Sequence, residues 1–194
     1  MFDVVIGIVA VVALGGAIYA STLGDVARRS AQRALQAKRV LTATTPVGAE
    51  VVVIGKVQPG GTELDAPLSG RPCVAHRSRM YLGGVDGAHH EQAGCVPFTL
   101  ERDDGSHVVI DASHAQFVFP PLPLPADAPE RCAAFANALG VAPRVQRRAA
   151  YEEILVLEGM RIAVAGRLVA GWANGQPARV GGDATAPITI GVPF

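Results

Sequence analysis

The sequence has few aromatic residues and no excess charge of either sign. Of its 194 residues, 5% are Phe, Tyr or Trp, and there is one Trp. Seventeen Lys and Arg residues balance seventeen Asp and Glu residues. A surface that stacks nucleobases needs several aromatic side chains, and one that binds a phosphate backbone needs excess positive charge. We therefore expect no nucleic-acid partner.

The first part of the chain lacks charge altogether between Asp3 and Asp25. Nine of the 17 residues of Val4–Ala20 are Val, Ile or Leu. A helix that continued to Leu23 would be about 30 Å long, which is the thickness of the hydrocarbon core of a bilayer. We expect residues 1–24 to form a transmembrane signal anchor. A cleaved signal peptide is the alternative, but it would need a basic segment before the apolar run.

This anchor would contact membrane lipid along residues 4–24. Gly16, Ala20 and Gly24 follow one another at four-residue spacing. Small residues at this spacing allow two membrane helices to pack closely. The spacing therefore suggests a homo-oligomer formed through the transmembrane helix.

Basic residues follow the uncharged run, and by the positive-inside rule this flank stays in the cytoplasm. We expect a single-pass membrane protein with its N-terminus outside and the rest of the chain cytoplasmic. Residues 25–46 are predicted to be a basic juxtamembrane helix, over Val26–Leu41, and a linker. The helix would bind anionic headgroups, or serve as a plain stop-transfer flank. The candidate binding residues are Arg28, Arg29, Arg33, Lys38 and Arg39.

Two apolar stretches share one pattern, Gly48–Val57 and Gly159–Leu168. In both, a glycine opens the run, a second glycine follows seven residues later, and a basic and an apolar residue close it. Val and Ile suit a pleated sheet, so both stretches are predicted to be core strands of an internal repeat. Two unrelated buried strands are the alternative.

Residues 47–194 are predicted to form one β-rich domain of the α+β type, a small β-barrel or sandwich with an internal pseudo-repeat. A Pro-rich linker and one inserted helix occupy residues 119–140, and Gly140 ends the helix. Cys73–Tyr81 is predicted to pair with a strand at Val96–Leu100 around a Gly-rich loop, Leu82–Gly94.

That loop holds the metal-ligand candidates His89 and His90, and Cys95 follows it. Imidazole and thiolate are zinc ligands, which would allow a metal-dependent hydrolase. Adjacent residues of an extended chain point apart, however, so we expect a solvated loop with no metal and no cofactor. Cys73 and Cys95 could form a disulfide in an oxidising compartment and would stay reduced in the cytoplasm. Cys132 is predicted to be a small core residue.

The ordered set of motifs resembles the GIDE domain, which lies beside the membrane in ubiquitin ligases of organellar outer membranes. No one motif is specific, but together they cover most of residues 47–168. They lie at Gly48–Val57, Ala66–Val74, Val96–Leu100, Asp104–Asp111 and Glu152–Leu168.

In those ligases the GIDE region engages partners, while a C-terminal RING domain binds the conjugating enzyme. A RING needs eight paired Cys or His ligands, and this sequence has three Cys, five His and no Cys-x-x-Cys pair. The resemblance thus implies a non-catalytic, membrane-anchored module that recruits a protein or a membrane-side partner. The alternative is a component of a ubiquitin-ligase-like system whose RING unit is on another chain.

Overall fold

The structure is a computed structural model that describes residues 29–58, 61–82, 89–112, 114–125, 128–146, 149–173 and 175–194. The predicted transmembrane anchor and Arg28 lie outside these residues. Within the described residues, no helix is both long enough and apolar enough to cross a bilayer.

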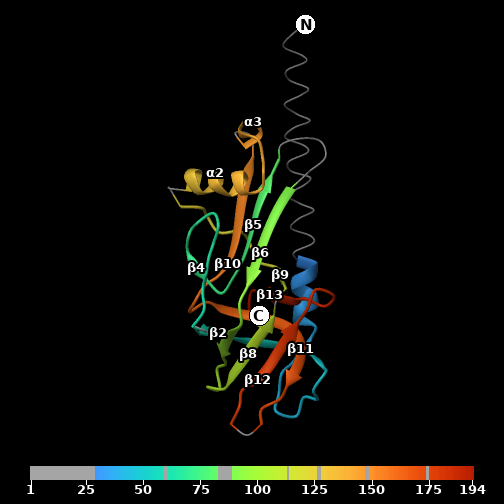
Figure 1. The fold of residues 1–194 in the computed structure, drawn as a ribbon. Helices are drawn as coiled ribbons and strands as arrows, with labels where there is room; N and C mark the ends of the chain where they lie inside the picture. The colour runs from blue at the N-terminus through green and yellow to red at the C-terminus, as the bar shows by residue number, and fades with distance from the viewer. Residues whose placement is uncertain are drawn as a thin grey trace.

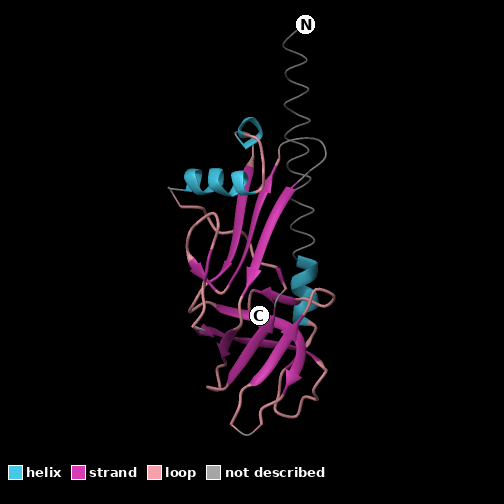
Figure 2. Cartoon of the chain, viewed as in Figure 1, coloured by secondary structure: helices cyan, strands magenta, loops and turns pink. Residues whose placement is uncertain are grey.

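The described chain is mainly β, as predicted from its many short apolar runs (Figure 2). A helix over residues 29–36 comes first. The elements that follow are β1 (Arg39–Val40), β2 (Glu50–Gln58), β3 (Leu64–Asp65), β4 (Pro72–Cys73), β5 (Ala75–Tyr81), β6 (His89–Cys95), β7 (Phe98–Glu101), β8 (His107–Ala112), β9 (Ala115–Phe117), α2 (Ala128–Ala138), α3 (Pro143–Gln146), β10 (Ala150–Val156), β11 (Arg161–Ala170), β12 (Ala178–Gly182) and β13 (Ile188–Gly191).

Five strands close into a barrel in the order β2-β7-β8-β12-β11, because β11 also pairs with β2. Four of the five pairings are antiparallel, and β8 and β12 run parallel. The short strands β1, β13 and β9 extend the same sheet outside the barrel. The prediction of a small β-barrel is therefore confirmed.

The two stretches with the shared pattern are neighbours in this barrel, since β2 and β11 pair over seven residue positions. At each end of the β2–β11 pair, the amide of a glycine donates a hydrogen bond to the other strand. The Gly48 amide donates to the Leu168 carbonyl at 2.8 Å, and the Gly159 amide donates to the Val57 carbonyl at 2.9 Å. Both glycines have a positive φ, of 90° and 78°, which L-residues rarely adopt. The shared pattern thus corresponds to equivalent positions at the two ends of one antiparallel pair.

The second glycine of each stretch allows another strand to approach closely. A Cβ at Gly55 would lie 2.6 Å from the carbonyl oxygen of Glu101, and one at Gly166 would lie 2.8 Å from Val180 Cγ1. Real Cβ atoms do not come so close to other heavy atoms. These glycines therefore let β2 and β11 curve against β7 and β12 and close the barrel.

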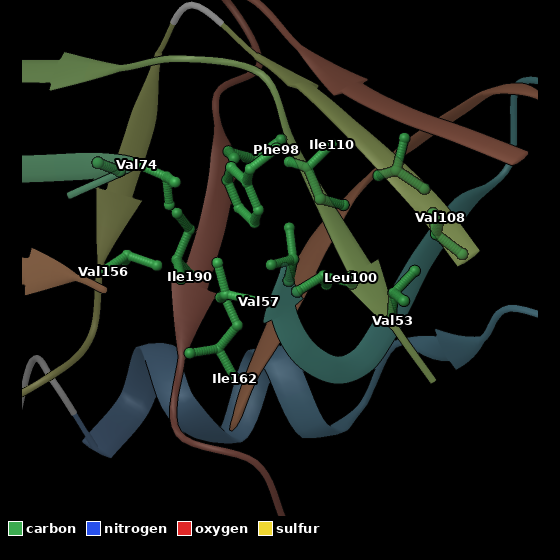
Figure 3. Packing of buried hydrophobic residues seen from close by; sticks show 14 of the residues in the cluster. Val53, Val57, Val74, Phe98, Leu100, Val108, Ile110, Val156, Ile162 and Ile190 are labelled. Carbon is green, nitrogen blue, oxygen red and sulfur yellow. The ribbon is translucent and has the colours of Figure 1, made fainter. Parts of the chain in front are cut away.

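The barrel interior is filled by aliphatic side chains and Phe98, which alternate with outward residues along the strands (Figure 3). Val74 and Val156 belong to the same cluster although they lie outside the barrel strands. The Val74 amide donates to the Val156 carbonyl at 2.9 Å. The second sheet is therefore anchored in the barrel core.

The helix over residues 29–36 covers the outer face of β2 and β11. Leu35 is 1% exposed and packs with Val52, Ala163 and Ala165. The helix was predicted to reach Leu41, but it ends at residue 36, and Arg39–Val40 pairs with β2 as β1 instead. The extended chain satisfies backbone groups of β2 and brings Leu41 into the barrel core, where it is fully buried.

The second sheet, in the order β10-β5-β6, forms an arm that projects from the barrel and carries α2 and α3 at its far end (Figure 1). Apolar residues of α2, including Cys132 and Phe135, pack with Leu68 and Met80. The predicted helix end is confirmed, because Gly140 follows α2 with a φ of 72° and its amide donates to Asn137.

Two sequence-based pairings were wrong. Residues 89–94 were predicted to lie in a loop, yet they belong to β6, which pairs with β5 along its whole length. Val96–Leu100 was predicted to pair with β5, but the strand there, β7, pairs with β2 and β8 in the barrel. The sequence of β6 does not show a strand pattern because its residues are mostly polar and face solvent. Backbone pairing with β5, rather than apolar burial, holds β6 in the sheet.

Candidate functional site

The predicted basic residues lie on the helix over residues 29–36 and just after it. Arg29, Arg33 and Arg39 are exposed, and the first two share a helix face at four-residue spacing. Lys38 forms an ion pair with Glu50, and its hydrogen bond lowers the pKa of that carboxyl. Gln32 Nε2 donates to the Val192 carbonyl at 2.6 Å, so a hydrogen bond holds the helix in addition to the packing of Leu35. The structure therefore presents Arg29 and Arg33 on a fixed surface.

The structure does not bring the metal-ligand candidates together. His89 and His90 are adjacent on β6, and Cys95 ends the same strand. Side chains of adjacent strand residues point to opposite faces, and six residues of strand span about 20 Å. Across the described residues, no group of three or more His, Cys, Asp or Glu side chains could hold a metal ion.

All three cysteines are free thiols. Burial raises the pKa of Cys73 to about 12, aided by the charge of Glu153, and burial raises the pKa of Cys95 to about 11. The Cys73 thiol donates to the Leu64 carbonyl at 3.4 Å. Cys132 lies on the buried face of α2, as predicted for a core residue.

Glu153 on β10 has a buried carboxylate that accepts hydrogen bonds at the base of the arm. Its side chain is 1% exposed and accepts three hydrogen bonds. Oε1 accepts from the Leu68 amide and the Ser78 hydroxyl, both at 2.8 Å, and Oε2 accepts from the Ser69 amide at 3.0 Å. The carboxylate thus fixes the turn that precedes β4 onto the arm, which is a structural role.

A cleft of about 670 Å³ lies at the end of the barrel where β7 and β8 meet the turn between β11 and β12. It is lined by Thr99, Ser106, His107, Trp172, Gln176 and Pro177, together with small residues of the turn. None of the described lining residues is Asp, Glu, Lys or Arg. The cleft is therefore suited to an uncharged group with both apolar and hydrogen-bonding parts.

Several contacts hold the Trp172 side chain in place in this cleft. Its Nε1–H donates to the His107 carbonyl at 3.2 Å. The Arg102 guanidinium lies 5.6 Å from the indole ring centre, a cation–π contact. Arg102 is itself fixed by hydrogen bonds to the Ser106 hydroxyl at 3.1 Å and to the Leu41 carbonyl at 3.4 Å. The indole is consequently a rigid wall of the cleft.

Two tight turns shape the cleft, and one of them engages the Ser106 hydroxyl. Asp104 Oδ1 accepts from the Ser106 amide at 2.9 Å and from the Ser106 hydroxyl at 2.5 Å, across a turn in which Gly105 has a φ of 76°. In the other turn the Gln176 amide donates to the Ala173 carbonyl at 2.8 Å. The Ser106 hydroxyl is thus directed into its own turn rather than toward a substrate.

The turn at Gly171–Pro177 is not among the sites predicted from the sequence. One signal was available, namely that the sole Trp of the chain stands in this turn. A large aromatic side chain in a turn needs either a core to enter or a surface role. The partner residue Arg102 could not be found, because 70 residues separate it from Trp172 in the sequence.

A second groove, of about 680 Å³, lies at the tip of the arm between α2, α3 and β10. Its walls are mostly apolar, and they include Leu124, Pro129, Cys132, Ala133, Pro143 and Tyr151.

Comparisons of the chain with protein-family models, with curated proteins and with solved structures found no match.

Proposed function

We propose that this protein is a single-pass, membrane-anchored binding module whose barrel lies on the cytoplasmic side and recruits a protein partner through the Trp172 cleft. The observation that carries the proposal is the fixed indole of Trp172 in an open cleft of uncharged polar residues. Tryptophan is enriched at the energetic centres of protein interfaces, since it offers a large rigid contact area.

The polar groups around the cleft support binding rather than chemistry. The Trp172 Nε1–H, the Arg102 guanidinium and the Ser106 hydroxyl are all engaged in intramolecular hydrogen bonds. These groups fix the shape of the cleft, and the indole surface is left as the main contact for a partner. In five-stranded Greek-key barrels of the OB type, the second and third strands and the loop between the last two strands bind ligands. The cleft lies at the corresponding elements, an analogy of architecture alone.

The membrane-bound state is supported by the uncharged run before Asp25 and by the basic residues after it. Arg29 and Arg33 are exposed on a helix that the buried Leu35 fixes to the barrel. A bilayer contact at these residues would therefore orient the whole barrel. The resemblance to the GIDE domain agrees with this placement, and the ligase-like alternative rests on that resemblance alone.

Site-specific photo-crosslinking tests the proposal. A photoreactive residue at Gln176, in the cleft, is compared with one at Glu130, an exposed position on α2 at the other end of the molecule. We expect a discrete protein adduct from position 176 that Trp172→Ala abolishes, and no such adduct from position 130. The same adduct from both positions, or one that survives Trp172→Ala, would refute the cleft as the binding site.

A further inference from the structure

The tip of the arm combines an apolar groove with exposed apolar and basic residues. Val145 on α3 is 41% exposed, and its neighbours Pro143 and Arg144 are exposed as well. The groove of about 680 Å³ opens beside them. An apolar surface with adjacent cations is the composition that binds at the boundary between headgroups and acyl chains.

The charge of this part of the chain favours an anionic surface. Among the described residues 128–146, Arg131 and Arg144 stand against Glu130, which leaves a net charge of +1. Each basic residue close to an anionic membrane strengthens binding severalfold. A bilayer that contains anionic lipid therefore complements the tip in both polarity and charge.

The arm also points in the required direction. In Figure 1 it projects on the side where the helix over residues 29–36 begins, and α2 and α3 lie well beyond that helix. A strand of seven residues such as β5 is about 23 Å long. Residues 25–28, which separate the uncharged run from the described helix, span about 14 Å even when fully extended. The arm is therefore long enough to reach the bilayer surface.

We infer that the tip of the arm, formed by α2 and α3, docks on the lipid surface as a second membrane contact besides the anchor. Val145 and the groove meet the acyl-chain boundary, and Arg144 meets anionic headgroups. This inference rests on the proposed anchor. It adds that the module is held at two points, which directs the Trp172 cleft away from the membrane, since the β11–β12 turn lies at the opposite end from α2 and α3 (Figure 1).

Quenching of tryptophan fluorescence by brominated phospholipids tests this contact. The full chain is reconstituted in phosphatidylcholine vesicles with and without phosphatidylglycerol, and flotation shows whether it is membrane-bound. The reporter variant is Val145→Trp in a Trp172→Phe background, and Ala133→Trp on α2 is a second reporter. Wild-type protein, whose only Trp is Trp172, is the matched control.

We expect both reporters to be quenched at least twofold by brominated lipid, and Trp172 of the wild type to be unaffected. Arg144→Glu should remove most of the quenching in vesicles with phosphatidylglycerol. Chain that floats with the vesicles but shows no more quenching at positions 145 and 133 than at Trp172 would overturn the docking and leave the anchor intact; the groove would then be open to a protein. Chain that does not float would overturn both.

Discussion

Glu153→Gln tests how the arm is attached to the barrel. The carboxylate accepts from two backbone amides and one hydroxyl while it is 1% exposed. Hydrogen bonds to a charged acceptor contribute about 1.5–3 kcal/mol each, and an amide leaves one of the donors without an acceptor. Removal of a buried charge recovers part of this loss. We expect a net destabilisation of about 3 kcal/mol, or about 6–12 °C in Tm for a chain of this length.

The matched control is Glu152→Gln, the same change at the adjacent residue. Glu152 faces the other side of β10 and pairs with Arg79 at 3.6 Å, with a side chain 21% exposed. Such a pair contributes less than about 1 kcal/mol. Ser78→Ala should fall between the two variants, at about 1.5–2 kcal/mol, since it removes one hydrogen bond to the charged carboxylate.

Thermal unfolding in detergent gives the global effect, and hydrogen exchange gives the local one. In Glu153→Gln the amides of Leu68 and Ser69 should exchange faster, whereas in Ser78→Ala they should stay protected, because that variant keeps both amide contacts. Equal Tm values for Glu153→Gln and Glu152→Gln, or unchanged exchange at Leu68 and Ser69, would refute the proposed role of the carboxylate.

Three further predictions concern the barrel and its titratable groups. Gly55→Ala should cost about 2–3 kcal/mol of unfolding free energy, because its Cβ would meet the Glu101 carbonyl, and chemical denaturation measures it. Burial lowers the pKa of His76, and the charge of Glu153 opposes this effect. The unfolded chain therefore binds the proton more strongly, and stability should fall as pH drops below 6.5. His76→Phe should reduce this dependence of stability on pH. Burial raises the pKa of Cys73 to about 12, so stability should fall as pH rises above 9, and Cys73→Ala should reduce that decline.

The Gly55 prediction has a control within the chain. Gly48→Ala, at a positive φ but with open space around the new Cβ, should cost about 1 kcal/mol. If Gly55→Ala were no worse than Gly48→Ala, close approach would not explain the second glycine of the repeat. Wild-type slopes in His76→Phe or Cys73→Ala would contradict the assigned cause.

Local patterns in the sequence were sufficient to predict β2 and β11 of the barrel and β5 and α2 of the arm, but not β6. Val-rich runs with opening and closing glycines mark β2 and β11, because inward and outward residues of a barrel both meet apolar neighbours there. The strand β6 carries His89, His90 and Glu91 and has no such pattern, since backbone pairing with β5 and a solvent-facing side account for it.

The candidate sites show the same division. Exposure of Arg29 and Arg33 follows from helical spacing, which local sequence encodes. The Trp172 cleft depends on Arg102 and His107, which come from elements 60 or more residues earlier in the chain. Only the closure of the barrel brings these residues together, and no single-sequence pattern records that closure.

The topology of the membrane-bound chain is the central claim, and thiol labelling tests it most directly. The native thiols are buried or half-buried with a raised pKa, so a reporter is needed at Val169→Cys, a position on β11 that is 54% exposed. A membrane-impermeant maleimide is applied to intact cells and to lysed cells, with the wild type as baseline. We predict labelling of Val169→Cys only after lysis, in protein that remains in the membrane fraction after carbonate extraction. Labelling in intact cells, or release by carbonate, would contradict the account.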